Sequence, residues 1–165
     1  MDKEKQHSTS SPLKSTIGLD MLVHDVMTRD IISVQKYESV LHVAHILAEK
    51  NISGLPVVDK KNKVIGIITQ ADILSVVGIR KEHTLKDLLK HMLGEPLPEK
   101  KLGDIVADIM VSPAVTIKPT ANIAVAAQVL DEKRIRRLPV VDAENRLIGL
   151  ISRADILKAV LKKLK

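Results

Sequence analysis

Two four-residue stretches place a hydroxyl and a carboxylate three residues apart, each directly after an apolar run. They read Thr69-Gln70-Ala71-Asp72 and Ser152-Arg153-Ala154-Asp155. At the start of a helix this spacing forms a capping box, in which the hydroxyl accepts from an early backbone N–H and the carboxylate reaches back. The same groups suit a ligand, because a carboxylate accepts from both hydroxyls of a diol and a helix N-terminus favours an anion. Capping and ligand contact can coexist in one side chain.

Both motifs belong to a sequence that is written twice. Residues 23–77 align with residues 106–160 at a constant shift of 83 without a gap, and 22 of the 55 positions are identical. The pentapeptide LPVVD at Leu55–Asp59 returns at Leu138–Asp142. A gapless duplication implies two copies of one supersecondary unit that hide their apolar faces against each other. We therefore expect function in the cleft between the copies.

Hydrophobic spacing predicts the order strand, helix, strand, strand, helix in each copy. In the first copy a short leading helix at 21–27 precedes strands at 31–34, 55–58 and 64–68 and helices at 39–50 and 69–77. In the second copy the predicted strands are 114–117, 138–141 and 147–151, and the predicted helices are 122–133 and 154–164. The expected fold class is therefore α/β (α+β).

The predicted domain organisation follows from this order. Residues 1–18 form a flexible polar tail, 19–78 the first repeat, 79–103 a linker with a short helix at 84–93, and 104–165 the second repeat. The tail has no apolar run, which argues against a secretory signal, and no stretch is long enough to span a bilayer. We expect a cytoplasmic protein.

The amino-acid composition excludes some kinds of site and favours some classes of partner. The 165 residues are 45% hydrophobic but include one Tyr, no Phe and no Trp, so the core must be aliphatic. The absence of Cys excludes disulfides, thiolate zinc sites and cysteine nucleophiles. The net charge of +6 favours anionic partners, such as phosphorylated small molecules, nucleic acid or acidic lipid. The scarcity of aromatic residues weakens the case for single-stranded nucleic acid, which usually stacks on aromatic platforms.

The repeated LPVVD strand, the strand with a central glycine (Gly66 and Gly149) and the T/S-x-x-D helix start together resemble the cystathionine-β-synthase (CBS) domain pair, or Bateman module. The resemblance covers residues 21–164 except most of the linker. It implies two β-α-β-β-α repeats packed with pseudo-twofold symmetry, which bind an adenosine-containing ligand and regulate an enzyme or transporter. Such modules are rarely catalysts, and they tend to pair into dimers.

The resemblance also implies roles for particular residues. Asp72 and Asp155 match the residues that accept from ribose hydroxyls, and Thr69 and Ser152 match those that face the ribose or phosphate. The first strand of each repeat, with Ile32, Ser33, Ala114 and Val115, would contact the adenine, although a plain core strand is the alternative interpretation.

A basic cluster, Lys133-Arg134-Ile135-Arg136-Arg137, precedes the second LPVVD. By itself it suits a solvated helix C-terminus, where cations complement the macrodipole. In the family, basic residues at the positions of Arg136 and Arg137 contact phosphate, and Arg153 is a further candidate; guanidinium forks fit phosphate oxygens. The first repeat has Ser53 and Gly54 there, so the two sites should not be equivalent.

The histidines and the C-terminal lysines could bind a metal or an anionic partner, but a structural interpretation is favoured for each. His42 and His45 share one helix face, but no carboxylate cluster accompanies them, so a polar surface is favoured over a metal site. The basic C-terminal stretch KAVLKKLK is interpreted as a packed helix with solvated lysines. No catalytic constellation stands out.

These observations predict a regulatory, non-enzymatic module that binds AMP, ADP, ATP or S-adenosylmethionine. No cofactor is expected to be required. The module would signal to a partner protein through a shift between conformations. We expect a homodimer, with Val23, Val26, Val106 and Ile109 of the leading helices available for pairing. The alternative is a basic nucleic-acid-associated protein that uses the CBS pair as a scaffold.

Overall fold

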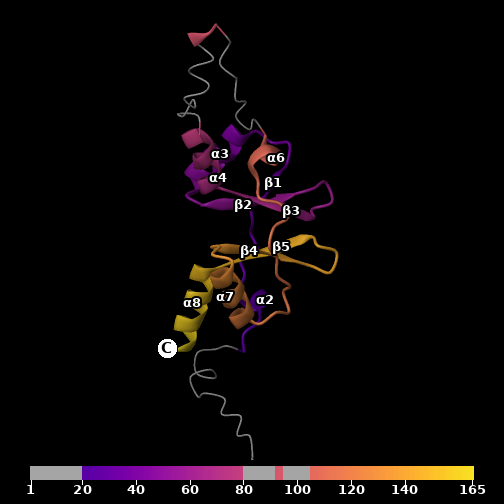
Figure 1. Ribbon diagram of the computed structural model, residues 1–165. Coiled ribbons are helices and arrows are strands. Elements are labelled where there is room, and N and C mark those ends of the chain that lie inside the picture. The colour runs from indigo at the N-terminus through magenta and orange to yellow at the C-terminus, as the bar shows by residue number, and fades with distance from the viewer. Residues whose placement is uncertain (1–19, 80–91, 95–104) are drawn as a thin grey trace, which may run out of the picture. The chain divides into compact units, whose positions relative to one another are not determined.

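The computed structural model describes residues 20–79, 92–94 and 105–165 (Figure 1). The predicted polar tail and nearly all of the predicted linker helix at 84–93 lie outside these ranges. Within them, the order of elements in each repeat is a short leading helix followed by strand, helix, strand, strand and helix, with one exception described below.

The first repeat contains α2 (Val23–Val26), β1 (Val34–Gln35), α3 (Val40–Lys50), β2 (Gly54–Val58), β3 (Val64–Thr69) and α4 (Gln70–Ile79). The second contains α6 (Val106–Ile109), α7 (Ile123–Glu132), β4 (Arg137–Val141), β5 (Leu147–Ser152) and α8 (Arg153–Lys163). The predicted α/β class is confirmed. The predicted pseudo-twofold packing of the repeats stays a prediction.

The first strand of each repeat is shorter than predicted. The strand expected at 31–34 appears only as β1, which pairs in parallel with β2, and the strand expected at 114–117 reduces to one bridge between Ile117 and Val140. Proline sets this limit. Ile117 N–H donates to Pro139 O, but Pro139 has no N–H to return to the next position, Val115. Pro56 stands in the same relation to Ile32, so the ladder stops there in both repeats.

The chain folds into two compact units that do not coincide with the repeats. One unit combines the segment up to Ile31 with Val115–Ala143 and Ile148–Lys165, and the other combines Ile32–Ala114 with Glu144–Leu147. We call them the Asp155 unit and the Asp72 unit, after the motif carboxylate in each. The leading helix of each repeat thus belongs to the unit built around the other repeat.

Matching hydrogen bonds hold the exchanged segments. In the Asp155 unit Val23 N donates to Ala121 O at 2.8 Å, and in the Asp72 unit Val106 N donates to Glu38 O at 2.9 Å. Each pair maps onto the other by the shift of 83. A second matched pair, Thr28 N to Leu150 O and Val111 N to Ile67 O, fixes the segment after each leading helix against a strand.

Each unit has its own aliphatic core. In the Asp155 unit the buried side chains come from α2, α7, β4 and β5, and in the Asp72 unit from α3, β1, β2, β3 and α6. Val23 and Val106 lie in these cores with no exposed surface, and Val26 and Ile109 pack partly buried against them. Val23 and Val106 are therefore not available for pairing between copies, because the exchanged helices bury them within the chain, whereas for the partly exposed Val26 and Ile109 the expectation stays a prediction.

A methionine lies over the central glycine of the long strand in each unit. A Cβ at Gly149 would overlap the side-chain end of Met27, whereas a Cβ at Gly66 would lie 2.8 Å from the carbonyl oxygen of Val111 as well as 2.9 Å from Met110 Sδ. A flexible thioether can move aside more easily than a hydrogen-bonded backbone carbonyl. The two glycines therefore occupy equivalent sequence positions, but Gly149 can accept a larger side chain more easily than Gly66.

We expect Gly66→Ala to lower the free energy of unfolding by about 1–3 kcal/mol, in the range of overpacked cores. Gly149→Ala should cost less, because Met27 can repack. Urea denaturation followed by circular dichroism measures both variants. A loss from Gly149→Ala that equals or exceeds the loss from Gly66→Ala would contradict this explanation.

Candidate functional site

The Ser152 and Asp155 motif forms a capping box at the junction of β5 and α8. Asp155 N donates to Ser152 Oγ at 3.2 Å, while Ser152 N and Ser152 Oγ donate to Asp155 Oδ2 at 2.8 and 2.7 Å. A strand that ends on a hydroxyl residue and turns directly into a helix needs such acceptors for its first N–H groups. The structure therefore confirms the capping box that the spacing of Ser152 and Asp155 predicts.

Thr69 and Asp72 repeat this geometry between β3 and α4. Asp72 N donates to Thr69 Oγ1 at 3.3 Å, and the Thr69 amide and hydroxyl both donate to Asp72 Oδ2 at 2.8 Å. The two motifs therefore differ little in their own hydrogen bonds. Any difference in ligand binding between them must come from the neighbouring residues.

In each motif one carboxylate oxygen takes no part in helix capping. In Asp155 and in Asp72 all of the capping bonds go to Oδ2, so Oδ1 takes no part in them. Both side chains are half-buried. Because an ionised carboxylate has about four acceptor positions, each can still accept a diol while it caps its helix.

Two consecutive arginines stand where β4 begins, and one of them, Arg137, interacts with Asp155. Arg137 begins β4 and is half-buried, whereas Arg136 is exposed. Burial lowers the pKa of the Arg137 guanidinium, the negative charge of Asp155 opposes this effect, and the positive charge of Arg136 adds to it. The guanidinium remains charged, so it holds a partly desolvated positive charge close to a carboxylate and a second cation.

The same places in the Asp72 unit hold Ser53 and Gly54. The backbone is alike, since Gln70 N donates to Ser53 O at 2.9 Å just as Arg153 N donates to Arg136 O at 3.4 Å. Gly54 is buried, however, and a Cβ there would lie 3.1 Å from Ile68 O. The Asp72 unit thus lacks cations at both positions.

Arg153 is committed elsewhere in the structure. Its Nη2 donates to Leu130 O at 3.0 Å and lies 3.9 Å from an Asp131 carboxylate oxygen, so it satisfies the C-terminal end of α7. The matching Gln70 does the same in the other unit, where Nε2 donates to Ile52 O at 3.1 Å. These bonds give Arg153 a structural role at the end of α7.

The first-strand residues divide between the two units. Val115 lies in the Asp155 unit, whereas Ile32, Ser33 and Ala114 are assigned to the Asp72 unit. Val115 is 38% exposed and Ile32 is 39% exposed, which is unusual for large aliphatic side chains in a strand position. Each precedes the paired part of the strand, at the position where proline prevents further pairing, so each unit offers one accessible aliphatic side chain there.

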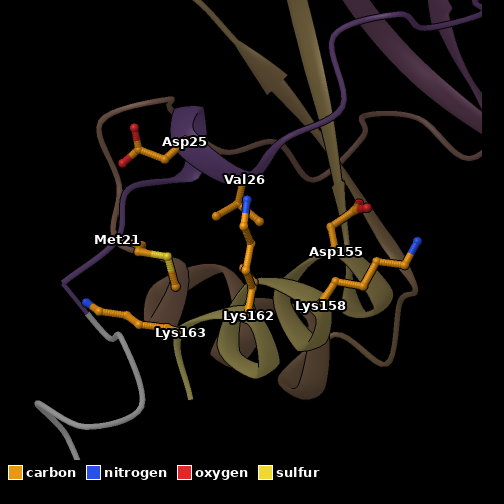
Figure 2. A pocket seen from close by; sticks show the side chains of 8 residues that line it. Met21, Asp25, Val26, Asp155, Lys158, Lys162 and Lys163 are labelled. Carbon is orange, nitrogen blue, oxygen red and sulfur yellow. The ribbon is translucent and has the colours of Figure 1, made fainter. Parts of the chain in front are cut away.

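A hollow of about 500 Å³ opens beside Asp155 (Figure 2). Its charged lining residues are Asp25, Asp155, Lys158, Lys162 and Lys163, and its apolar ones are Met21, Val26 and Ala159. Figure 2 shows the three lysines and Asp155 on α8, with Met21, Asp25 and Val26 on the segment across from it. Sequence analysis assigned these lysines to a solvated surface, although the spacing of Asp155, Lys158 and Lys162 already places them on one helix face.

The described residues contain no group of three or more side chains suited to hold a metal ion. His42 and His45 are both exposed on α3. In the same part of the chain, no helix combines the length and apolar character that crossing a bilayer requires.

The matches to known proteins cover both repeats of the chain. The CBS domain model matches residues 23–79 and 106–162. Among curated relatives, the MJ1426 protein of Methanocaldococcus jannaschii is 31% identical over 87% of this chain and 94% of its own length. Inosine-5'-monophosphate dehydrogenase of the same organism is 33% identical over 81% of this chain, which spans only 22% of that enzyme.

Two solved structures are similar in fold. CBSX2 of Arabidopsis thaliana, crystallised in complex with AMP, superimposes with a TM-score of 0.71 at 29% identity over 87% of this chain and 98% of that one. The CBS domain pair of protein MJ0100, in complex with 5'-methylthioadenosine and S-adenosyl-L-methionine, gives a TM-score of 0.68 at 25% identity over the same shares. With two CBS domains matched over most of its described length, the chain belongs to the CBS domain family as a tandem pair.

Proposed function

We propose that this chain is a regulatory module that senses an adenosine-containing ligand, and that its dominant site is organised by Asp155. The observation that carries the proposal is the arrangement around this carboxylate. Asp155 keeps Oδ1 outside its capping box, and its charge acts on the half-buried guanidinium of Arg137, which is also close enough to Arg136 to feel that positive charge. A ribose phosphate supplies the diol for the first and the negative charge for the second.

The proposed contacts follow from these positions. The ribose hydroxyls donate to Asp155, Ser152 faces the ribose or phosphate, and the phosphate lies against Arg136 and Arg137. The adenine packs on the exposed side chain of Val115. Ala114 belongs to the Asp72 unit and takes no part in this contact, whereas Arg153 acts through the α7 terminus and supports the helix start.

The Asp72 site is the weaker one in this proposal. Thr69 and Asp72 offer the same hydroxyl and carboxylate, and Ile32 and Ser33 offer the same strand edge. No arginine accompanies them, since Ser53 and Gly54 occupy the matching positions. A ligand with little negative charge, such as adenosine or S-adenosylmethionine, suits this site better than a nucleotide.

The relatives support the ligand class. CBSX2 was crystallised with AMP, and the MJ0100 pair with S-adenosyl-L-methionine, and both ligands contain adenosine. The positive charge beside Asp155 favours AMP, ADP or ATP over S-adenosylmethionine, which is cationic at sulfur. We further propose that the module is cytoplasmic, is not itself an enzyme, and passes its ligand state to a partner protein by a population shift.

Self-association is part of the proposal. With Val23 and Val106 buried, the exposed apolar side chains on α4 and α8 replace them as candidates. Leu74 is 67% exposed, Leu157 at the matching position is 59% exposed, and Leu161 is 52% exposed. Leucines this exposed on two equivalent helices favour pairing with a second copy.

We expect a homodimer by light scattering at tens of micromolar protein, as an order of magnitude for a stable interface of standard size. Leu157→Lys should shift the mass toward the monomer, whereas Leu41→Lys, on α3 and also highly exposed, should not. A monomeric wild-type protein would contradict the proposal.

A second candidate function, nucleic-acid binding, is favoured only by the net charge of +6. It predicts affinity for DNA or RNA that falls steeply with added salt and does not compete with adenosine compounds. The sensor proposal predicts the opposite pattern. Fluorescence anisotropy with labelled DNA and RNA, with and without excess AMP, distinguishes the two.

We expect Asp155 and Asp72 to differ in their contribution to ligand binding, although they contribute equally to helix capping. Asp155→Ala and Asp72→Ala should each cost about 1 kcal/mol of stability, because each removes equivalent capping bonds. In titration calorimetry, Asp155→Ala should abolish most of the AMP binding, whereas Asp72→Ala should leave the tight site nearly intact. Equal losses of AMP affinity would contradict the proposed asymmetry.

The arginines provide the matched test of phosphate recognition in the same titrations. Arg136→Ala or Arg137→Ala should weaken AMP by roughly tenfold or more while changing adenosine little, since a charge-assisted contact contributes about 1.5–3 kcal/mol. A variant that weakens both ligands equally would show that these arginines do not contact the phosphate. The absence of heat with every adenosine compound at millimolar level would refute the sensor function for this chain.

A further inference from the structure

Three lysines and two carboxylates, Asp25 and Asp155, line the hollow. Lys163 pairs with Asp20, and Asp25 accepts from the backbone N–H of Leu22 and lies 3.0 Å from His24 Nε2. Lys158 and Lys162 form no ion pair with any of the residues that the structure describes. Within the described part of the chain, these two ammonium groups are therefore the charges of the hollow that have no direct ion-pair partner.

Helix stability does not account for the pair of lysines together. They are separated by four residues on α8, and like charges at this spacing repel. The matching positions on α4 are Ser75 and Ile79, so the repeat folds without cations there. Both lysines are exposed and contribute nothing to the core. The macrodipole favours a cation in the last turn of a helix, which covers Lys162 but not Lys158 in the middle of α8.

The arrangement suits an extended anion. The helical rise of about 1.5 Å per residue places Lys158 roughly 4.5 Å and Lys162 roughly 10.5 Å beyond Asp155 along the axis. The three share one stripe of α8, and the apolar side chains of Met21, Val26 and Ala159 line the hollow with them. Spaced point charges on flexible stems fit a chain of oxyanions better than a single planar carboxylate.

We propose that this hollow is a second anion site, and that it binds a chain of two or more phosphate groups along Lys158 and Lys162. The site is distinct from the arginine pair on β4, which serves the phosphate next to the ribose in the proposed function. The chain belongs either to a nucleoside di- or triphosphate held at Asp155 or to a free inorganic oligophosphate. In either case the number of phosphates, and not only the adenosine, determines what the Asp155 unit binds.

Titration calorimetry without divalent cations tests this with three probes, AMP, ATP and sodium tripolyphosphate. The test protein is the full chain with Lys158→Gln and Lys162→Gln, which keep the stems and remove both charges. The control is Lys60→Gln with Lys61→Gln, two exposed lysines in the turn between β2 and β3 of the Asp72 unit. Both double variants lower the net charge equally, so non-specific attraction falls equally in both.

We expect the α8 double variant to weaken tripolyphosphate, or to remove an advantage of ATP over AMP, by roughly tenfold. The control should stay within about twofold of wild type by the same measure, and AMP should be little affected in either variant. The α8 double variant also identifies the source: it lowers the affinity for ATP relative to AMP if the chain is that of the nucleotide, and it lowers only tripolyphosphate binding if the chain is free.

Two outcomes would overturn the inference. One is a wild-type protein that binds tripolyphosphate not at all and ATP no better than AMP. The other is an equal loss in the α8 and control variants, which would reduce the effect to net charge. Either outcome leaves the proposed function intact as long as AMP binds and requires Asp155.

Discussion

The hydrogen bonds between a hydroxyl and a carboxylate at the strand-to-helix junction hold the candidate site in place. Ser152 and Asp155 cap α8 with one carboxylate oxygen, which fixes the orientation of the other. The same junction ties α8 to β4, since Arg153 N donates to Arg136 O. The basic residues before β4 and the carboxylate on α8 therefore keep a constant relation, and a ligand meets an arrangement that exists before it binds.

Proline completes this arrangement on the neighbouring strand. Because Pro139 and Pro56 cannot donate to the ladder, Val115 and Ile32 remain beyond the paired strand and stay exposed. A chain with almost no aromatic residues thereby obtains one accessible aliphatic side chain in each unit. The difference between the two units lies in charge. The Asp155 unit has Arg136, Arg137, Lys158 and Lys162 at positions where the first repeat has Ser53, Gly54, Ser75 and Ile79, whereas Lys163 matches another cation, Arg80.

Much of this could be predicted from the sequence, because the information is local. Spacing alone identifies the two capping boxes, and the comparison of Arg136 with Ser53 reveals the asymmetry without any coordinates. The exchange of leading helices could not be predicted this way. Val23 and Val106 occur in nearly identical apolar patterns, so the sequence does not indicate which repeat each one packs against, and that choice is made by tertiary contacts. The shortened first strands follow from Pro56 and Pro139, whose effect depends on the pairing register. The macrodipole explains a lysine near the C-terminal end of α8, and only the hollow shows that Lys158, Lys162 and Asp155 line one depression of the surface.

The central claim is that an adenosine ligand is held by Asp155 in preference to Asp72. A crystal structure of this chain grown with substoichiometric AMP tests it most directly. The account predicts AMP with its ribose hydroxyls on the Asp155 carboxylate and its phosphate on Arg136 and Arg137, while the Asp72 site takes up nucleotide only at higher concentration. AMP that occupies Asp72 first, or that binds away from both capping boxes, would contradict it.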